Sequence, residues 1–186
     1  MLLPELLQAN FRLSPAKAKE VSSLFREDLL EKGDYFLRRG QTVRKLSFLR
    51  SGHLRGWAPA GNKDITQWIF TSDYFVTDLN CLLFGLPARW NVQALSSCVL
   101  ATLPEENYLR ISEIVPNWEL LEKQFLGRCF STLEDRVFTF LSLSAKERYE
   151  ALQAWQPELF DHVPLHYLAS MLGMTAETLS RIRKVQ

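Results

Sequence analysis

Glycine residues divide the stretch from about residue 28 to residue 103 into short apolar segments. Gly33, Gly40, Gly52 and Gly61 recur every 7 to 12 residues, which is the usual spacing of strands in a sandwich or barrel. No helical segment separates these strands, and parallel neighbours would need such a crossover. The pattern therefore predicts an antiparallel jelly roll.

Within this roll, the sequence predicts particular strands. Residues 46–57, with the Ser51-Gly52 turn at their middle, are expected to form a hairpin. Residues 65–70 are expected to form another strand, and residues 91–103 a final pair of strands.

Short helices are predicted on both sides of the roll. Ser14 and Pro15 are typical of a helix start, and the helix is expected to run to about Phe25 and to bury Val21, Leu24 and Phe25. Residues 104–115 are expected to form a short helix that Pro116 ends.

The longest periodic segment is residues 117–143, where apolar residues recur in steps of three and four. It predicts a helix of roughly 40 Å. One apolar set is Trp118, Leu121, Phe125, Cys129, Leu133, Val137, Phe140 and Leu141, and a second is Leu120, Leu126, Phe130 and Phe138. A helix with two apolar stripes can serve its own roll and a symmetric copy of itself, so a homodimer through residues 117–143 is expected.

The C-terminal segment predicts three more helices and a tight turn. Ser144 and Glu147 form a capping box that starts one helix, which Pro157 ends. Pro164 then starts a helix that packs Leu165, Leu168, Ala169 and Leu172. Gly173 supplies a left-handed turn, and Thr175 caps a last helix that turns Leu179 and Ile182 inward. Residues 163–186 are thus typical of a helix-turn-helix, whose second helix can enter a DNA major groove.

This order of parts resembles the cyclic-AMP receptor protein/FNR (Crp/Fnr) family of bacterial transcription regulators. Residues 31–55, 143–165 and 168–184 carry the resemblance most specifically. It implies an α+β fold: a cyclic-nucleotide-binding-like jelly roll with flanking helices, a long dimerisation helix and a C-terminal helix-turn-helix. The implied division is a sensor domain at 1–116, the dimerisation helix at 117–143 and a DNA-binding domain at 144–186.

The family's DNA-reading pattern, E-x-x-[SG]-R, falls on Glu177, Ser180 and Arg181. The chemistry agrees, because a carboxylate can accept from a cytosine amine and a guanidinium can donate to guanine O6 and N7. Where the cyclic-AMP receptor has a further base-reading arginine this chain has Ala176, so the pattern resembles the FNR branch more closely.

Other residues of the C-terminal segment fit a DNA interface less specifically. Thr175, His166 and Arg183 are expected phosphate contacts. The simpler alternative is that Glu177 complements the helix dipole and Arg181 is solvated.

The family's nucleotide contacts are not matched in the roll. Thr77-Asp78 stands where the family has Gly-Glu, and Arg89 is followed by the bulky Trp90. These four residues are the candidate ligand site, but they predict a roll that does not bind cyclic nucleotide. Arg89 and Asp78 are expected to form a structural ion pair or to be a remnant. A different, apolar or aromatic ligand stays open because Phe75, Phe84 and Trp90 occur here.

No cofactor, metal site or enzyme chemistry is predicted. The first 80 residues contain no cysteine for an iron–sulfur cluster, and His53 is the only histidine in the roll for haem or a cupin-like metal enzyme. Cys81, Cys98 and Cys129 are expected to be buried, reduced thiols. Without a signal peptide or a long apolar run, a cytoplasmic protein is expected.

The sequence therefore predicts a homodimeric transcription regulator that binds DNA. The alternative is a ligand-binding sensor of the same fold with weakened or lost DNA binding. The resemblance implies wing strands beside the helix-turn-helix. Only residues 157–163 precede it and the sequence ends at Gln186, so weaker DNA binding or a truncated chain is expected. An activator would also need RNA polymerase as a partner, and no segment identifies that surface, the effector or the target genes.

Overall fold

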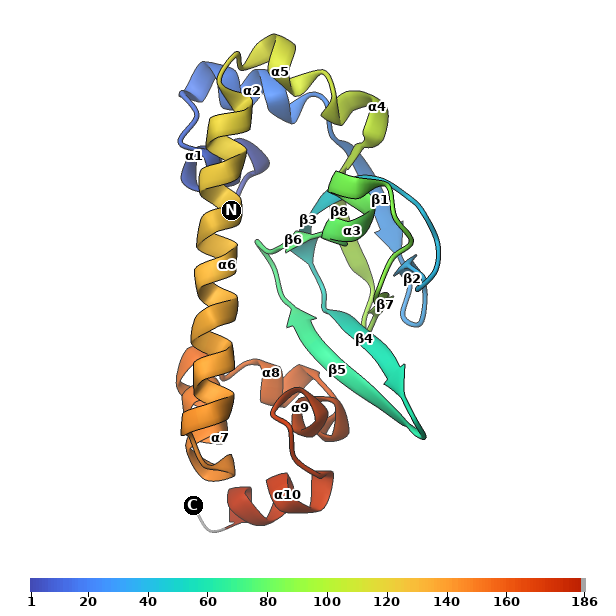
Figure 1. Cartoon of the computed structure of the whole chain (residues 1–186), viewed down its shortest axis with the longest axis vertical. Helices are drawn as coiled ribbons and strands as arrows, with labels where there is room; N and C mark the ends of the chain where they lie inside the picture. Colours follow the sequence, from blue (N-terminus) through green and yellow to red (C-terminus); the bar gives the residue numbers. More distant parts are fainter. Residues whose placement is uncertain (185–186) are drawn as a thin grey trace.

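Two antiparallel sheets form a roll in the computed structural model, which describes residues 1–184 (Figure 1). One sheet has the order β1 (Arg26–Leu30), β8 (Cys98–Pro104), β3 (Lys45–Ser51), β6 (Phe75–Val76). The other has the order β2 (Tyr35–Leu37), β7 (Asn91–Ala94), β4 (Leu54–Ala60), β5 (Lys63–Phe70). The predicted antiparallel roll is confirmed.

The predicted hairpin at residues 46–57 is wrong, because its two strands belong to different sheets. β3 pairs with β8 and β6, whereas β4 pairs with β5 and β7. The two strands predicted at residues 91–103, β7 and β8, also belong to different sheets. Gly52 has φ +90°, and a Cβ there would collide with the carbonyl of Ser97, so this turn is a close crossing between sheets. The hairpin in this region is β4–β5, turned at Gly61.

Two N-terminal helices, α1 (Leu3–Phe11) and α2 (Pro15–Ser22), lie beside the roll. α1 was not predicted. α2 begins as expected, with the Ser14 hydroxyl accepting from the Lys17 amide. It ends three residues earlier than predicted, with Val21 and Leu24 buried and Phe25 only partly buried.

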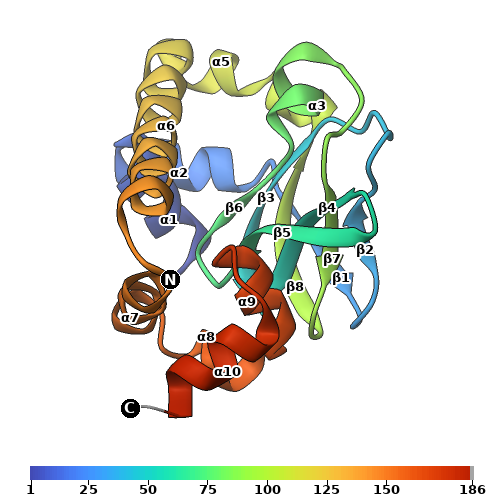
Figure 2. The same ribbon diagram turned by 60° about the horizontal axis from the view of Figure 1, so that its bottom comes forward.

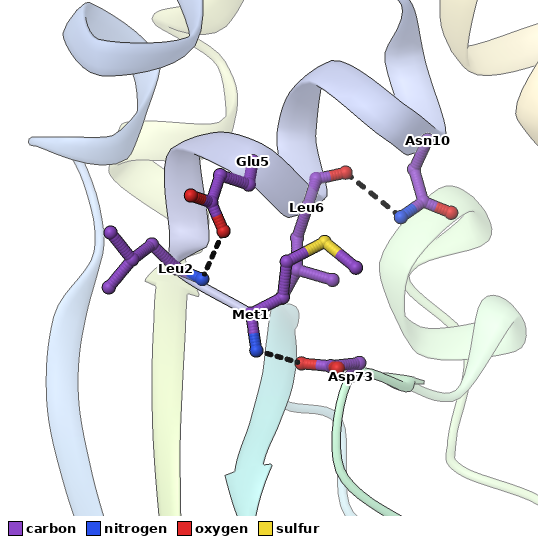
Figure 3. A network of polar contacts seen from close by, with 6 residues as sticks. All are labelled: Met1, Leu2, Glu5, Leu6, Asn10 and Asp73. Carbon is purple, nitrogen blue, oxygen red and sulfur yellow. Dashed lines mark hydrogen bonds and ion pairs between the residues drawn. The ribbon is translucent and has the colours of Figure 1, made fainter.

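Polar contacts occur near both ends of α1 (Figure 3). The Glu5 carboxylate accepts from the Leu2 amide at 2.9 Å, and the Met1 nitrogen lies 3.4 Å from the Asp73 carboxylate in the loop before β6. Near the helix end, the Asn10 amide donates to the Leu6 carbonyl. Leu6, Leu7 and Phe11 are buried, so α1 joins the core.

Three short helices connect the later parts of the roll. α3 (Leu79–Phe84) lies between β6 and β7, and α4 (Glu105–Tyr108) and α5 (Ile111–Ile114) follow β8. The single helix predicted at 104–115 is therefore two helical turns, which direct the chain toward the long helix.

The long helix is α6 (Trp118–Ser142), close to its predicted bounds. Its first half packs on α1, with the Phe11 ring centroid 4.6 Å from that of Trp118 and 4.8 Å from that of Phe125. In its second half Phe130, Val137 and Leu141 are 62%, 60% and 82% exposed. The first predicted stripe does not stay on one face of the helix. Successive residues turn by about 100°, so Val137 and Leu141, predicted in the first stripe, share the exposed face of Phe130, which was predicted in the second.

The chain ends in α7 (Ala145–Trp155), α8 (Leu159–His162), α9 (Leu165–Met171) and α10 (Ala176–Lys184). The Ser144–Glu147 capping box is present, and the Thr178 amide donates to the Thr175 hydroxyl at 3.2 Å. Gly173 has φ +68°. The predicted caps and turn are confirmed; residues 185–186 of the predicted C-terminal segment lie outside the described residues.

α9 docks on strand β5 of the roll (Figures 1 and 2). Ile69 of β5 is 1% exposed and lies in one apolar cluster with Leu168 and Leu179. The Thr66 amide donates to the Ser170 hydroxyl at 2.9 Å, and the buried Arg55 guanidinium lies 3.9 Å from the Tyr167 ring centroid. The C-terminal helices and the roll thus share a core.

Two further sequence expectations can be compared with the structure. Cys81 and Cys98 are buried free thiols as expected, but Cys129 is only half-buried on α6. Among residues 1–184, no helix is long and apolar enough to cross a membrane.

Replacing Ile69 with alanine tests this shared core. We expect Ile69→Ala to lower the free energy of unfolding by about 2–5 kcal/mol, because it leaves a cavity among packed apolar groups. Ile65→Ala on the same strand, where the side chain is 42% exposed, is the matched control and should cost less than about 1 kcal/mol. Equal losses in urea denaturation would contradict the assigned core.

Candidate functional site

The predicted DNA-reading residues lie together on the solvent-facing side of α10. Glu177 and Arg181 are exposed and four residues apart, so they share one helix face, with Ser180 partly exposed beside it. On the opposite side Leu179 is fully buried and Ile182 packs against the same cluster. The core therefore fixes which face of α10 is presented to solvent.

The cap of α10 sets the charge state of Glu177. Hydrogen bonds from its own backbone amide and from the Thr175 hydroxyl lower the pKa of the Glu177 carboxyl below its ordinary value. Both hydrogen bonds thus favour the carboxylate form of this side chain. Among the described residues neither Glu177 nor Arg181 forms an ion pair, so both remain available to a partner.

The turn before α10 is packed against the long helix. A Cβ at Gly173 would lie 2.8 Å from the ring of Phe140 on α6, and the φ of +68° also favours glycine. Phe140 is therefore the contact through which α6 touches this turn.

The three predicted phosphate contacts are only partly together. Thr175 and Arg183 are exposed on α10 and its cap, with the Arg183 guanidinium 6.0 Å from the Phe160 ring centroid. His166 is exposed on α9, where its ring lies 4.0 Å from that of Tyr167.

All four candidate ligand residues line one cavity of about 670 Å³ between the roll and α6. Thr77, Asp78, Arg89 and Trp90 face it together with Phe75 and Phe84, the aromatic residues singled out in the sequence. The sequence did not point to Trp68, Tyr74, Phe125 or Trp155, which also line it. These residues lie far apart in the chain, and no local pattern joins them.

The expected ion pair between Arg89 and Asp78 is wrong. The buried Asp78 carboxylate caps α3 by accepting from the Asn80 and Cys81 amides at 2.9 and 3.2 Å. Its other oxygen accepts from the backbone amide of Arg89, also at 2.9 Å, while the Arg89 side chain is exposed. Asp78 thus holds the loop that carries Arg89 and Trp90.

The sequence matches no protein-family model and no curated protein sequence. Similar solved structures exist, however. The catabolite activator protein of Thermus thermophilus is 21% identical, with a TM-score of 0.60 over 97% of this chain and 85% of that one. The c-di-GMP-responsive global regulator CLP of Xanthomonas campestris is 15% identical, with a TM-score of 0.70 over 92% and 91%.

A third similar structure covers a shorter part of this chain. The regulatory domain of Toxoplasma gondii PKA in complex with cAMP is 20% identical, with a TM-score of 0.53 over 59% of this chain and 42% of that one. The class of fold is therefore clear: the chain has a jelly roll of the cyclic-nucleotide-binding type. More particularly, its fold is that of the Crp/Fnr-type regulators, as the sequence resemblance implied.

A pair of histidines lies where the roll meets α8. The ring centroids of His53, in the β3–β4 turn, and His162 are 5.4 Å apart. Burial lowers the pKa of His53 below its ordinary value of 6.5, the charge of His162 lowers it further, and Glu158 opposes both effects.

The depressed pKa predicts lower stability in acid. Below about pH 6.5, His53 is protonated in the unfolded chain more readily than in the folded chain, because its pKa is lower in the folded chain. The free energy of unfolding should therefore fall as the pH drops from about 7.5 to 5.5. His53→Gln should reduce this slope in urea denaturation. An unaltered slope in His53→Gln would contradict the assignment.

Proposed function

We propose that this protein is a homodimeric transcription regulator that binds DNA through α10. The observation that carries the proposal is the exposed polar face of α10, held by its own buried face and its Thr175 cap. In this proposal α9, the Gly173 turn and α10 form a helix-turn-helix with α10 as the recognition helix.

The proposed contacts to DNA bases follow from the charges of Glu177 and Arg181. Glu177 and Arg181 lie one helical turn apart, which matches contacts to adjacent base pairs in a major groove. A guanidinium donating to guanine and a carboxylate accepting from cytosine would select a G·C-containing half-site. Ser180, Thr175 and Arg183 would contact neighbouring bases or phosphates, and His166 the flanking backbone.

The dimer is proposed to form through the exposed apolar face of α6. Phe130, Val137 and Leu141 continue one stripe along the half of the helix that the roll leaves uncovered. Such a patch is costly in a monomer, and a two-fold copy would cover it with like residues. Two-fold symmetry would present two recognition helices to half-sites roughly 34 Å apart.

The roll is proposed to be the sensor, within a division at 1–116, 117–143 and 144–186. Its cavity presents Thr77, Arg89 and Trp90 to a ligand. Cyclic nucleotide is not the ligand we propose, because Asp78 already accepts three backbone amides and Trp90 crowds the place of the phosphate.

Replacing Arg181 tests the proposed contact to DNA directly. We expect Arg181→Ala to weaken binding to a selected operator by about 1–3 kcal/mol at fixed salt, because a bidentate contact to guanine is lost. Selection from random DNA followed by a titrated gel shift with the full chain would measure it.

Lys19→Ala is the control for general charge effects, since Lys19 is exposed on α2. It should leave operator affinity unchanged. Operator binding by Arg181→Ala equal to that of the parent protein would refute the reading role. A selection that enriches no sequence would favour the sensor that has lost DNA binding.

A second test addresses the dimer. The double variant Phe130→Asp, Val137→Asp would place carboxylates in the proposed contact, and desolvation and repulsion of these charges should give a monomer of 21.5 kDa in light scattering. The parent protein should show twice this mass. Gln124→Glu, exposed elsewhere on α6, should remain dimeric; a monomeric parent would end the proposal of a dimer.

A further inference from the structure

A second, smaller cavity is lined by residues of β5, α6, α7 and α9. Its volume is about 290 Å³. The apolar part of its wall includes Trp68, Ile69, Leu152, Trp155, Met171 and Leu172. The Trp68 and Trp155 rings, 6.1 Å apart, also line the larger roll cavity, so they lie at the boundary of both. The lining of the smaller cavity nevertheless differs, because it contains Arg136 and Arg148, whereas the larger cavity has Arg89.

Two arginines give this cavity its charge. Arg136 of α6 donates one hydrogen bond to the Met171 carbonyl at 3.1 Å and lies 4.6 Å from the Trp68 ring centroid. Arg148 of α7 donates to the Leu143 carbonyl at 3.0 Å. Both guanidinium carbons lie within 5.5 Å of the Phe140 ring centroid.

No anion within the described residues neutralises either guanidinium. Neither Arg136 nor Arg148 forms an ion pair, although Asp135 also lines the cavity. The Arg148 Nε–H is buried and has no hydrogen-bond partner. Burial lowers the pKa of Arg136 to about 10, which still leaves it charged at neutral pH.

The missing counter-charge and the missing hydrogen-bond acceptor lower the stability of the fold unless a bound ligand supplies them. Arg136 and Arg148 are half-buried. A half-buried guanidinium without a counter-charge and a buried N–H without an acceptor both lower the stability of a fold. An anion that entered the cavity would supply the missing charge and acceptor together. The surrounding tryptophan, leucine and methionine side chains would suit an apolar body attached to that anion.

We propose that this cavity binds a small organic carboxylate with an apolar, aromatic or aliphatic body. The carboxylate lies at the end formed by Arg136 and Arg148, and the body packs between Trp68, Trp155 and Leu152. The volume is near the lower limit of about 300 Å³ for small-molecule sites, which limits the ligand to a compact acid.

The location of this site suits a ligand that regulates DNA binding, and only this regulatory role rests on the proposed function. A bound acid would contact β5 of the roll, α6 and the α9 helix that positions α10. Binding itself requires neither DNA nor a dimer, so it can be tested separately from the proposed function.

Isothermal titration calorimetry on the full chain would test the site with 3-phenylpropionate and octanoate. At least one acid should bind the parent protein with a Kd below about 10 mM, and about tenfold more tightly than its neutral amide. Inorganic phosphate, which lacks an apolar body, should bind more weakly than the acid. Equal binding of acid and amide, tighter binding of phosphate, or no binding of either acid would overturn the proposal.

Variants then identify the residues. Arg136→Met and Arg148→Met keep an apolar stem and should each weaken the acid about tenfold or more, as loss of a charge-assisted hydrogen bond predicts. Lys123→Met, which removes an exposed charge from α6 away from the cavity, should have no effect. If a variant fails to fold, the comparison of acid with amide on the parent protein still decides the question. Full binding by both folded arginine variants would refute the site.

Discussion

The contact between α9 and strand β5 is the interaction on which the arrangement of the C-terminal half depends. Ile69 enters the apolar cluster of the C-terminal helices, and the Ser170 hydroxyl accepts from the β5 amide of Thr66. Hydrogen bonds of this kind contribute about 1 kcal/mol each, so the buried apolar area supplies most of the stability and the polar contacts set the register. The orientation of α10 and the walls of the smaller cavity both follow from this docking.

The two cavities give the molecule two chemically different places for ligands. The larger lies between the roll and α6 and is lined by aromatic rings with one exposed arginine, Arg89. The smaller has two arginines that form no ion pair within residues 1–184. Trp68 and Trp155 line both. A change in the position of either ring would therefore alter both spaces, which is a physical basis for coupling between them.

Local signals in the sequence predicted local structure well. The Ser14, Ser144 and Thr175 caps and the Gly173 turn occur where expected, because each depends on a few adjacent residues. Strand partners were predicted poorly: β3 and β4 have the pattern of a hairpin, but they pair with different strands and cross closely at Gly52. The candidate ligand residues were found through their family positions. Trp68 and Trp155 carry no such signal, because folding alone brings them together.

Gly173 has a mechanical consequence. The Phe140 ring fills the space beside this glycine, so the end of α6 is in contact with the turn that leads into α10. A rotation of α6 about its axis would press the ring against the turn and carry α10 with it. In a two-fold assembly, the crossing angle of the two α6 helices would then determine the distance between the two α10 helices.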